Sequence, residues 1–355
     1  MHPIKEKNML SLASYRRSLY KNPRIRFLFF ELTDKCNLNC LHCGSNCNSS
    51  RNNKLDLAII KKTLDEVADR YNPRKIMVCL TGGEPLLYDY IYEVMTYSKK
   101  LGFLAGITSN GTLIDDDVAE KLVECGLDSI AISIDGLKKT HDKFRNKEGS
   151  FEKAFDGIRS LKKTGIEPNV TTVINKNSFR ELNQLYDLMK KENIYSWRVL
   201  NVEPIGRAKA SKDLLLDKSE LFKLFDYIKE KRFDVNNDID VTYGCSHFVT
   251  YDYEKSIRDF YFQCEAGVGV ASIAANGDIV ACLDIERRKD LVQGNIYIDS
   301  FIDVWENKYE IFRQDWSDKS KICKTCEHKK VCMGDSAHTW DYDNNEPLYC
   351  IKCLD

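Results

Sequence analysis

The sequence has no excess of charge of either sign. Its 355 residues include 53 basic and 54 acidic side chains, which leaves a net charge of −1 at neutral pH. This balance excludes a polybasic nucleic-acid arm, a supercharged surface and an acidic tail as the basis of function. The hydrophobic content of 43% argues against disorder, and the length suits about two domains or one barrel with an appendix.

Long hydrophobic runs are absent as well. No apolar segment approaches the roughly 18–20 residues that are needed to span a bilayer. The first 20 residues contain Lys5, Lys7, Arg16 and Arg17 but lack the apolar core of a signal peptide. We therefore expect a cytoplasmic protein with neither a membrane nor a nucleic acid as partner.

Against these absences stand 14 cysteines. Their share of the chain is well below the roughly 8–10% that marks a disulfide scaffold. In the cytosol, clustered cysteines indicate metal binding or catalysis instead. They gather in segment 36–47 and in segment 245–353, whereas Cys79 and Cys125 stand alone and are expected to be small buried hydrophobes.

Short apolar runs alternate with amphipathic segments in the cysteine-poor middle of the chain. The runs predict buried parallel strands at 25–32, 76–80, 104–108, 129–134, 169–174 and 197–202. A capping box from Ser178 to Glu181 is expected to open the last helix between them. Six strand–helix repeats predict an α/β fold, either a partial barrel or a doubly wound sheet, with ligands at the carboxyl ends of the strands.

The first cysteine group has the spacing Cys36-x3-Cys40-x2-Cys43 and directly follows the first predicted strand. Closely spaced thiolates of this kind can hold one soft metal centre. On spacing alone, an iron–sulfur cluster and a structural zinc loop completed by Cys47 or His42 are equally good hypotheses.

A Gly-Gly-Glu-Pro segment, residues 82–85, follows the second predicted strand. Alone it is typical of a turn, but after the cysteine loop it resembles the radical S-adenosylmethionine (SAM) superfamily, over residues 24–235. The resemblance implies a partial (β/α)6 TIM-type barrel and a [4Fe–4S] cluster on Cys36, Cys40 and Cys43, with SAM chelating the fourth iron. It also implies reductive cleavage of SAM to a 5′-deoxyadenosyl radical that abstracts hydrogen from a substrate. Three ligands leave one coordination position open, which marks a catalytic metal centre.

The same resemblance implies contacts to SAM at the strand ends. The implied residues are His42, Gly82, Gly83, Glu84, Pro85, Ser109, Asn110, Ser133, Asp135 and Arg145. Glu84 would pair with an ammonium group, Arg145 would meet the SAM carboxylate, and His42 would lie by the adenine. Cys47 is expected to remain a free thiol, because a fourth thiolate would exclude SAM.

The last third of the chain resembles SPASM, an extension of the superfamily that binds auxiliary iron–sulfur clusters. The spacing is Cys264-x12-Gly277-x4-Cys282, then Cys323-x2-Cys326-x5-Cys332, then Cys350, and it follows a Pro-Ile-Gly-Arg-Ala segment, 204–208, that commonly precedes this extension. The resemblance implies an extension at 1–23, the barrel at 24–235 and a small loop-rich iron–sulfur domain at 236–355. A zinc ribbon is the alternative for this domain.

One auxiliary cluster would be held by Cys323, Cys326, Cys332 and Cys350. The other would use Cys264 and Cys282, but the further cysteine that the pattern requires is replaced by Ser336. Cys245 and Cys353 are the thiols that could complete this site. Alternatively, Cys245 could return a hydrogen atom to the substrate radical.

Members with SPASM extensions mostly modify peptides and proteins, so the implied function is oxidative modification of a peptide, as a thioether or carbon–carbon cross-link. The implied partners are a precursor peptide, an electron donor such as flavodoxin or ferredoxin, and a separate leader-binding protein, since the segment before the first strand is too short for a fused one. The alternatives are a peptide epimerase using Cys245, an anaerobic sulfatase-type modifier, a small-molecule enzyme and a zinc-binding adaptor.

Acid–base residues do not follow from the sequence, because its histidines show no paired spacing such as HExxH. His338 and Asp335 are hypotheses for residues that line a cluster or the substrate, and Asp240 and Tyr243 are weaker ones.

Overall fold

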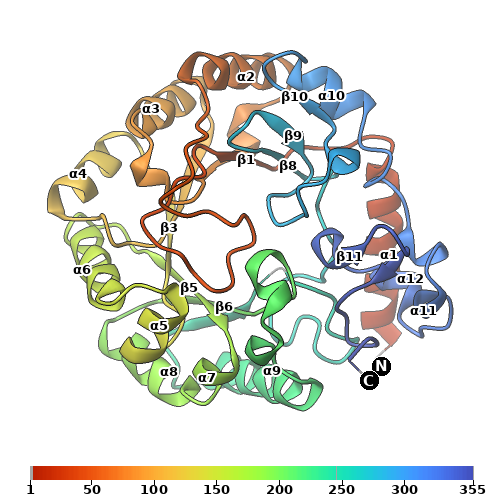
Figure 1. Cartoon of the computed structure of the whole chain (residues 1–355). Helices are drawn as coiled ribbons and strands as arrows, with labels where there is room; N and C mark the ends of the chain where they lie inside the picture. The colour runs from red at the N-terminus through yellow and green to blue at the C-terminus, as the bar shows by residue number, and fades with distance from the viewer. Residues whose placement is uncertain (1–2, 245, 355) are drawn as a thin grey trace.

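A computed structural model describes residues 3–244 and 246–354. Most of the chain forms a curved sheet with helices around its outside (Figure 1). The strands of this sheet are β1 (Phe27–Glu31), β2 (Met77–Thr81), β3 (Leu104–Ser109), β4 (Ser129–Ser133), β5 (Asn169–Ile174), β6 (Ser196–Asn201), β7 (Asp240–Tyr243), β8 (Val270–Ile273), β9 (Asp278–Val280) and β10 (Gly294–Asn295). A separate pair is formed by β11 (Trp340–Asp341) and β12 (Glu346–Pro347).

In the described residues, one or two helices lie between each strand and the next from β1 to β7, one helix precedes β1, and the last three follow β10. The helices are α1 (Pro3–Leu19), α2 (Leu57–Arg70), α3 (Ile91–Leu101), α4 (Asp116–Glu124), α5 (Lys138–Arg145), α6 (Ser150–Lys163), α7 (Lys176–Phe179), α8 (Leu182–Lys191), α9 (Lys218–Phe233), α10 (Phe301–Asn307), α11 (Lys321–Lys324) and α12 (Lys329–Cys332).

The sheet has the order β10-β9-β8-β1-β2-β3-β4-β5-β6-β7. Strands β1 to β7 run parallel to their neighbours, which confirms the α/β prediction and the six strands expected from the apolar runs. Beyond residue 235, β7 extends one edge of the sheet, and β8 pairs in parallel with β1 at the other. The C-terminal part of the chain therefore supplies strands at both ends of the barrel sheet, and the division near residue 235 stays a prediction.

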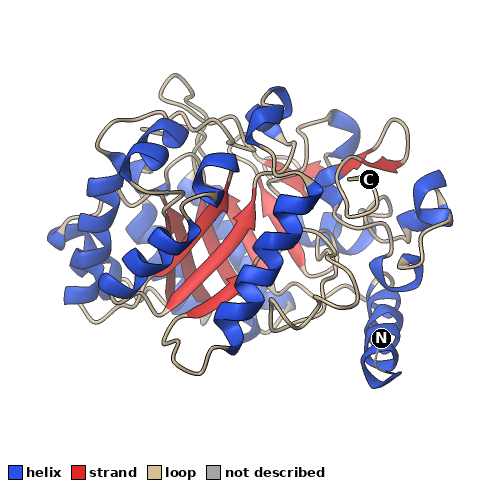
Figure 2. Cartoon of the chain, turned by 90° about the horizontal axis from the view of Figure 1, so that it is seen from below, coloured by secondary structure: helices blue, strands red, loops and turns tan. Residues whose placement is uncertain are grey.

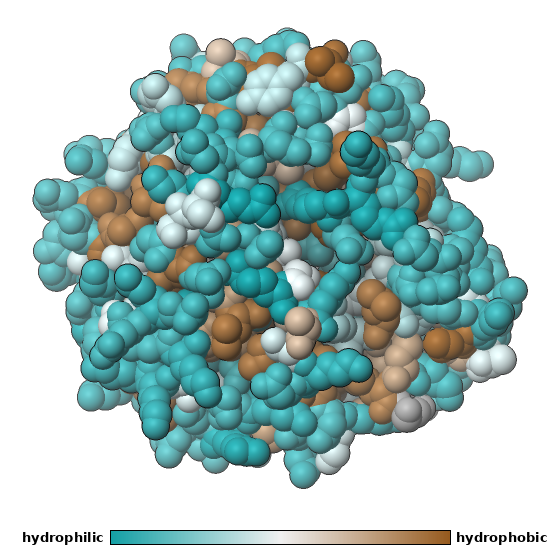
Figure 3. Space-filling view, in the orientation of Figure 1, coloured by the Kyte–Doolittle hydropathy of each residue, from teal (hydrophilic) through white to brown (hydrophobic). Residues whose placement is uncertain are grey.

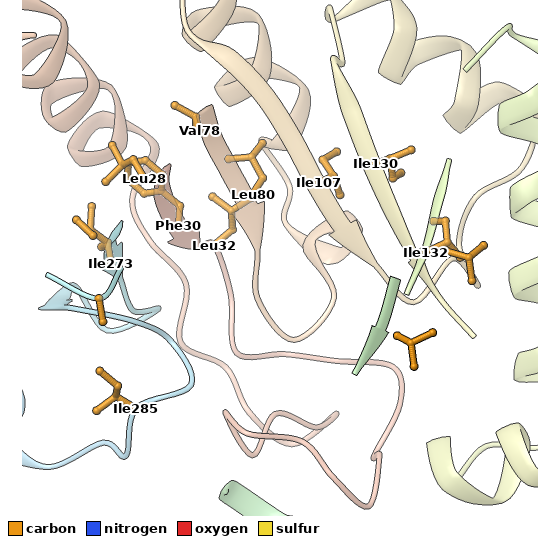
Figure 4. Packing of buried hydrophobic residues seen from close by; sticks show 14 of the residues in the cluster. Leu28, Phe30, Leu32, Val78, Leu80, Ile107, Ile130, Ile132, Ile273 and Ile285 are labelled. Atoms are coloured by element: carbon orange, nitrogen blue, oxygen red, sulfur yellow. The ribbon is translucent and has the colours of Figure 1, made fainter. Parts of the chain in front are cut away.

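The core lies between the sheet and the helices. Leu28 and Phe30 of β1 are fully buried and belong to one cluster with Val78 and Leu80 of β2 (Figure 4). Alternate residues of these strands face this core because side chains of a strand point to opposite faces in turn. Burial of each such side chain stabilises the fold by roughly 1.5–3 kcal/mol.

The capping box predicted for Ser178 and Glu181 is wrong by one turn. The box that forms joins Asn175 and Ser178 at the start of α7, and α8 begins after Glu181 without a side-chain cap. The reason is that the Glu181 carboxylate accepts hydrogen bonds from Leu137 N, at 2.9 Å, and from Thr140 Oγ1, at 2.6 Å. The Glu181 carboxylate, which the local pattern assigned to the cap of its own helix, is therefore used in a tertiary contact with the start of α5.

The N-terminal helix α1 packs beside α12 (Figure 1) and lies away from the sheet (Figure 2). Met9 of α1 is buried against Phe248, Phe262 and Val331. The first residues of the chain therefore pack against its C-terminal third. Within the described ranges, no helix is long and apolar enough to cross a bilayer, and the face seen in Figure 3 is mostly hydrophilic.

Candidate functional site

A cavity of about 330 Å³ lies at the carboxyl ends of the strands, where the loop after β1 crosses the middle of the barrel in Figure 1. Ligands of parallel α/β folds bind at this end of the sheet. The predicted site residues that line the cavity are Cys36, Cys40, His42, Cys43, Gly82, Gly83, Ser109, Asn110, Ser133 and Arg145. The structure thus brings together residues from the ends of four strands and from α5.

The loop that carries the first cysteines is closed at its base. The Asp34 carboxylate accepts hydrogen bonds from Asn53 N, at 2.8 Å, and from Asn53 Nδ2, at 2.6 Å. Isolated bridges also join Thr33 to Lys54 and Lys35 to Asn48. The loop therefore leaves and rejoins the barrel at one point and holds its cysteines over the cavity.

Each of the three predicted ligand sulfurs accepts a hydrogen bond. Leu38 N donates to Cys36 Sγ at 3.4 Å, Arg145 Nη1 to Cys40 Sγ at 3.7 Å, and Cys47 N to Cys43 Sγ at 3.4 Å. Hydrogen bonds to thiolate sulfurs stabilise the negative charge of an iron–sulfur cluster and adjust its reduction potential. The residues present therefore fit a cluster held by three thiolates.

Cys47 lies in the same buried group of cysteines. It donates to Cys43, and this hydrogen bond lowers the pKa of Cys43 and raises that of Cys47. The pair therefore favours a thiolate at Cys43 and a thiol at Cys47, whereas burial raises the pKa values of Cys36 and Cys40. The roles of Cys36, Cys40 and Cys43 as ligands and of Cys47 as a free thiol stay predictions.

Gly82 and Gly83 allow the end of β2 to lie directly against the cysteine loop. Gly83 N donates to Thr33 O at 2.7 Å. A Cβ on Gly83 would lie 2.2 Å from Lys35 O, and one on Gly82 would lie 2.4 Å from Thr33 O. No side chain fits at either position, so the Gly-Gly pair joins β2 to the loop.

Glu84 is fully buried behind the cavity and, like Pro85, is not among the lining residues. Its carboxylate accepts hydrogen bonds from Ser109 Oγ at 2.8 Å and from Asn110 N at 2.9 Å. In this structure Glu84 holds the end of β3 against the end of β2. Its pairing with an ammonium group stays a prediction.

Asp135 also lies behind the cavity and is fully buried. Its carboxylate is 2.6 Å from Arg145 Nε. Burial alone would raise the pKa of Asp135, but the Arg145 guanidinium lowers it, so the carboxylate keeps its charge. Asp135 therefore positions the arginine that reaches both Cys40 and the cavity.

His42 presents a flat, neutral ring beside these residues. It stacks on Phe144 with 4.1 Å between ring centroids and 6° between ring planes. Burial lowers the pKa of His42 to about 3, so the imidazole carries no charge at neutral pH. A neutral ring is compatible with the predicted place of His42 beside an adenine.

The auxiliary cysteines form two groups, as the spacing predicts. In the second group, burial and the neighbouring thiols Cys350 and Cys326 raise the pKa of Cys323 to about 11. Burial raises the pKa of the Cys332 thiol as well, with further contributions from Asp335 and from the thiols of Cys323, Cys350 and Cys326. Cys323, Cys326, Cys332 and Cys350 therefore lie near one another, and their sharing of one cluster stays a prediction.

Cys353 lies with this second group. Its sulfur is 2.7 Å from that of Cys350. Completion of the other auxiliary site by Cys353 stays a prediction, and Cys245 lies outside the described residues. Cys79 and Cys125 are half-buried rather than fully enclosed.

Cys264 and Cys282 of the first group both lie close enough to Tyr342 to act on its pKa. Ala337 N donates to Cys264 Sγ at 3.5 Å, which places the neighbouring Ser336 beside this group. The Ser336 hydroxyl is buried and donates to Ser246 O. Across the described chain, no three or more His, Cys, Asp or Glu side chains gather closely enough to hold a single ion such as zinc.

Sequence reasoning missed Glu31, Glu203, Arg207 and Asp284 among the charged residues that line the cavity, and also His247, which contacts Glu203. Glu203 lines the cavity together with His338, which the sequence had suggested. The one available signal was the position of Glu203 directly after an apolar run that predicts a strand. Asp335 and Tyr243 are buried, whereas Asp240 is exposed.

Comparisons with known proteins agree with this geometry. A model of the radical SAM superfamily matches residues 30–189, and a model of the SPASM iron–sulfur cluster-binding domain matches residues 264–327. An AdoMet-dependent heme synthase of Methanosarcina barkeri is 29% identical, over 92% of this chain and 96% of the relative. An Fe-coproporphyrin III synthase of the same organism is 26% identical, over 86% and 81% of the two chains.

A mycofactocin maturase, MftC, of Mycolicibacterium smegmatis is 27% identical, over 86% of this chain and 76% of the relative. Among solved structures, anSMEcpe with bound AdoMet and a Cp18Cys peptide superposes with a TM-score of 0.73 at 21% identity, over 93% and 94% of the chains. At this identity, the likeness to anSMEcpe shows the fold.

Proposed function

The chain belongs to the radical SAM superfamily and carries a C-terminal SPASM domain, and on this premise we propose that it oxidises a substrate by removing a hydrogen atom within the barrel cavity. Cys36, Cys40 and Cys43 would hold the SAM-binding [4Fe–4S] cluster. When bound, the cluster and SAM supply a reactive carbon radical that takes the hydrogen atom. The auxiliary cysteine groups would hold clusters that accept the electron left on the substrate.

The residues around the cysteines provide binding and positioning. Arg145, fixed by Asp135, places a positive charge beside Cys40, where a carboxylate of SAM would meet it. His42 and Phe144 offer a neutral stacked surface for a base. The Gly82–Gly83 backbone lines the cavity at the end of β2 and lies directly against the cysteine loop.

We propose an iron tetrapyrrole as the substrate. The supporting observation is that relatives named for making heme and Fe-coproporphyrin III match this chain over nearly its whole length. The match includes the C-terminal third, from which Asp284 and His338 reach the cavity.

A peptide is the second candidate substrate, which would undergo the cross-linking expected from the SPASM pattern. It is supported by the relative named as a mycofactocin maturase. In this case the partners would be a precursor peptide and a separate leader-binding protein. The epimerase alternative requires Cys245, and the sulfatase-type alternative requires a protein substrate.

The proposed compartment is the cytoplasm, because free thiolates that hold clusters need a reducing environment. A reduced flavodoxin or ferredoxin is the proposed electron donor.

The test uses the full chain with clusters reconstituted anaerobically and with chemical reductant. We expect SAM to be converted to 5′-deoxyadenosine, and the rate to rise when Fe-coproporphyrin III is added and consumed. A Cys40→Ala variant is the control and should form none. Stimulation only by the peptide encoded beside the gene would support the second candidate, and no 5′-deoxyadenosine under any condition would overturn the function.

A further inference from the structure

Glu203 is clamped between two histidines at the edge of the cavity. Its Oε2 lies 2.7 Å from His338 Nε2, and its Oε1 lies 3.2 Å from His247 Nδ1. The Glu203 side chain is 8% exposed and that of His338 is 11% exposed. Both carboxylate oxygens are therefore used inside the protein, and each has a histidine as its partner.

The three residues come from distant parts of the chain. Glu203 follows β6, His247 follows β7, and His338 lies in the C-terminal segment just before β11. The His247 ring also packs edge-on against Tyr349, with 5.3 Å between ring centroids. Tyr349 in turn accepts a hydrogen bond from Asn201 Nδ2 at 3.2 Å, so the barrel and the C-terminal segment jointly hold the group in place.

The contacts between Glu203 and His338 determine the charges of both side chains. Burial alone would lower the pKa of His338, but the Glu203 carboxylate raises it to about 9. The same contacts, chiefly the charge of His338, lower the pKa of Glu203 to about 2 against the effect of burial. At neutral pH His338 is therefore an imidazolium whose Nε2–H is taken by Glu203, with Nδ1–H as its second donor.

His338 lines the same cavity as Cys40, Arg145 and Ser133. Arg145 enters that cavity from α5 and is already bonded to Asp135 and Cys40. His338 enters it from the C-terminal segment and has no part in the cysteine loop. Besides Arg145 and Arg207, the cavity thus has a further cationic donor, which the C-terminal segment supplies.

We propose that His338, held by Glu203, binds a carboxylate group of the substrate and so fixes which part of the substrate faces the SAM-binding site. An imidazolium N–H and a carboxylate form a charge-assisted hydrogen bond, which is stronger and shorter than a neutral one. This anchor rests on the proposed function, since a tetrapyrrole such as Fe-coproporphyrin III carries carboxylates on a flat ring. The C-terminal segment would thus recognise a carboxylate group of the substrate.

The test measures binding, not turnover, in the reconstituted full chain. Fe-coproporphyrin III and its tetra-amide, which has nearly the same shape but no charge, are titrated separately and followed by the Soret band. We expect the wild type to bind the acid at least tenfold more tightly than the amide. The His338→Gln variant should lose most of this preference while its affinity for the amide changes little.

The matched control is Lys209→Gln. Lys209 also pairs with a carboxylate, Glu286, at 2.9 Å, but on the exposed surface and outside the cavity lining. This variant should keep the wild-type preference. The preference is also measured in the wild type alone, so the result does not depend on how well the His338→Gln variant folds.

Equal affinity of the wild type for the acid and the amide would overturn the anchor while leaving the tetrapyrrole function in place. An undiminished preference in His338→Gln would also overturn it. If neither porphyrin binds the wild type, both the anchor and the tetrapyrrole substrate fail, and conversion of SAM to 5′-deoxyadenosine then shows whether the radical SAM function itself stands.

Discussion

The Arg145 guanidinium joins a buried carboxylate to a cysteine sulfur: its Nε lies 2.6 Å from Asp135 Oδ2 and its Nη1 lies 3.7 Å from Cys40 Sγ. Asp135 is fully buried, so its charge depends on this partner. The pair thereby couples the stability of the barrel to the position of the cysteine loop.

Arg145→Gln is therefore expected to destabilise the protein by about 3–5 kcal/mol, because it leaves a buried carboxylate without its counter-charge. Arg145→Lys should cost less, since it keeps the charge but loses the fork that reaches both partners. Denaturant unfolding measures both. The control is Arg159→Gln, which breaks an exposed pair with Glu192 at 2.8 Å and should cost no more than about 1 kcal/mol; a similar loss in both variants would contradict this role.

Gly83→Ala is expected to abolish most cluster loading, because the added Cβ would lie 2.2 Å from Lys35 O and push the cysteine loop from the end of β2. Iron and sulfide per chain after reconstitution are the measurement. Gly165→Ala is the control: it has no neighbouring atom within 4 Å and only its φ of +85° to strain it, which costs about 1–2 kcal/mol. Full loading of Gly83→Ala would show that the contact is not needed.

Cys47→Ala is expected to keep the SAM-binding cluster, whereas Cys40→Ala should lose it. The reason is that Cys47 acts as the hydrogen-bond donor to Cys43 and so remains a thiol. Electron paramagnetic resonance of the reduced protein, with and without SAM, distinguishes the two variants. Loss of the SAM-sensitive signal in Cys47→Ala would make Cys47 a ligand instead.

The Glu203–His338 pair should make stability depend on pH in a defined window. The pKa of His338 is raised from 6.5 to about 9, so its contribution is complete below pH 6.5 and is lost as pH rises through 9. The pKa of Glu203 is lowered from 4.5 to about 2, so its contribution is complete above pH 4.5 and is lost as pH falls through 2. Both are present together between pH 4.5 and 6.5.

The difference in unfolding free energy between wild type and His338→Gln should therefore be largest in that window. It should shrink by about 3 kcal/mol by about pH 9.5, because the pKa of His338 rises from 6.5 to about 9 on folding. Denaturant unfolding at a series of pH values measures it. A difference that stays constant from pH 6 to pH 10 would mean that His338 is not charged in the folded protein.

Patterns among neighbouring residues were enough to predict the strands and the loop that follows the first strand. The apolar runs and the spacing of Cys36, Cys40 and Cys43 are patterns among neighbouring residues. They can be recognised without knowledge of the tertiary structure. The predicted capping box at Ser178 did not form, because the Glu181 carboxylate accepts a hydrogen bond from Leu137 N instead. Leu137 is distant in the sequence and therefore lies outside the local pattern.

By itself, then, the sequence predicted the parallel strands of an α/β fold and a three-cysteine loop after the first of them, and the resemblance that its motifs carry implied the barrel. The tertiary structure alone decided that β8 joins β1, that Cys353 lies by Cys350, and that Glu203, His247 and His338 meet at one cavity. These contacts join residues that lie far apart in the sequence, such as Phe27 of β1 with Val270 of β8, and Glu203 with His338. They form because burial of the core brings the segments together, and a buried carboxylate is stable only where such packing supplies its partners.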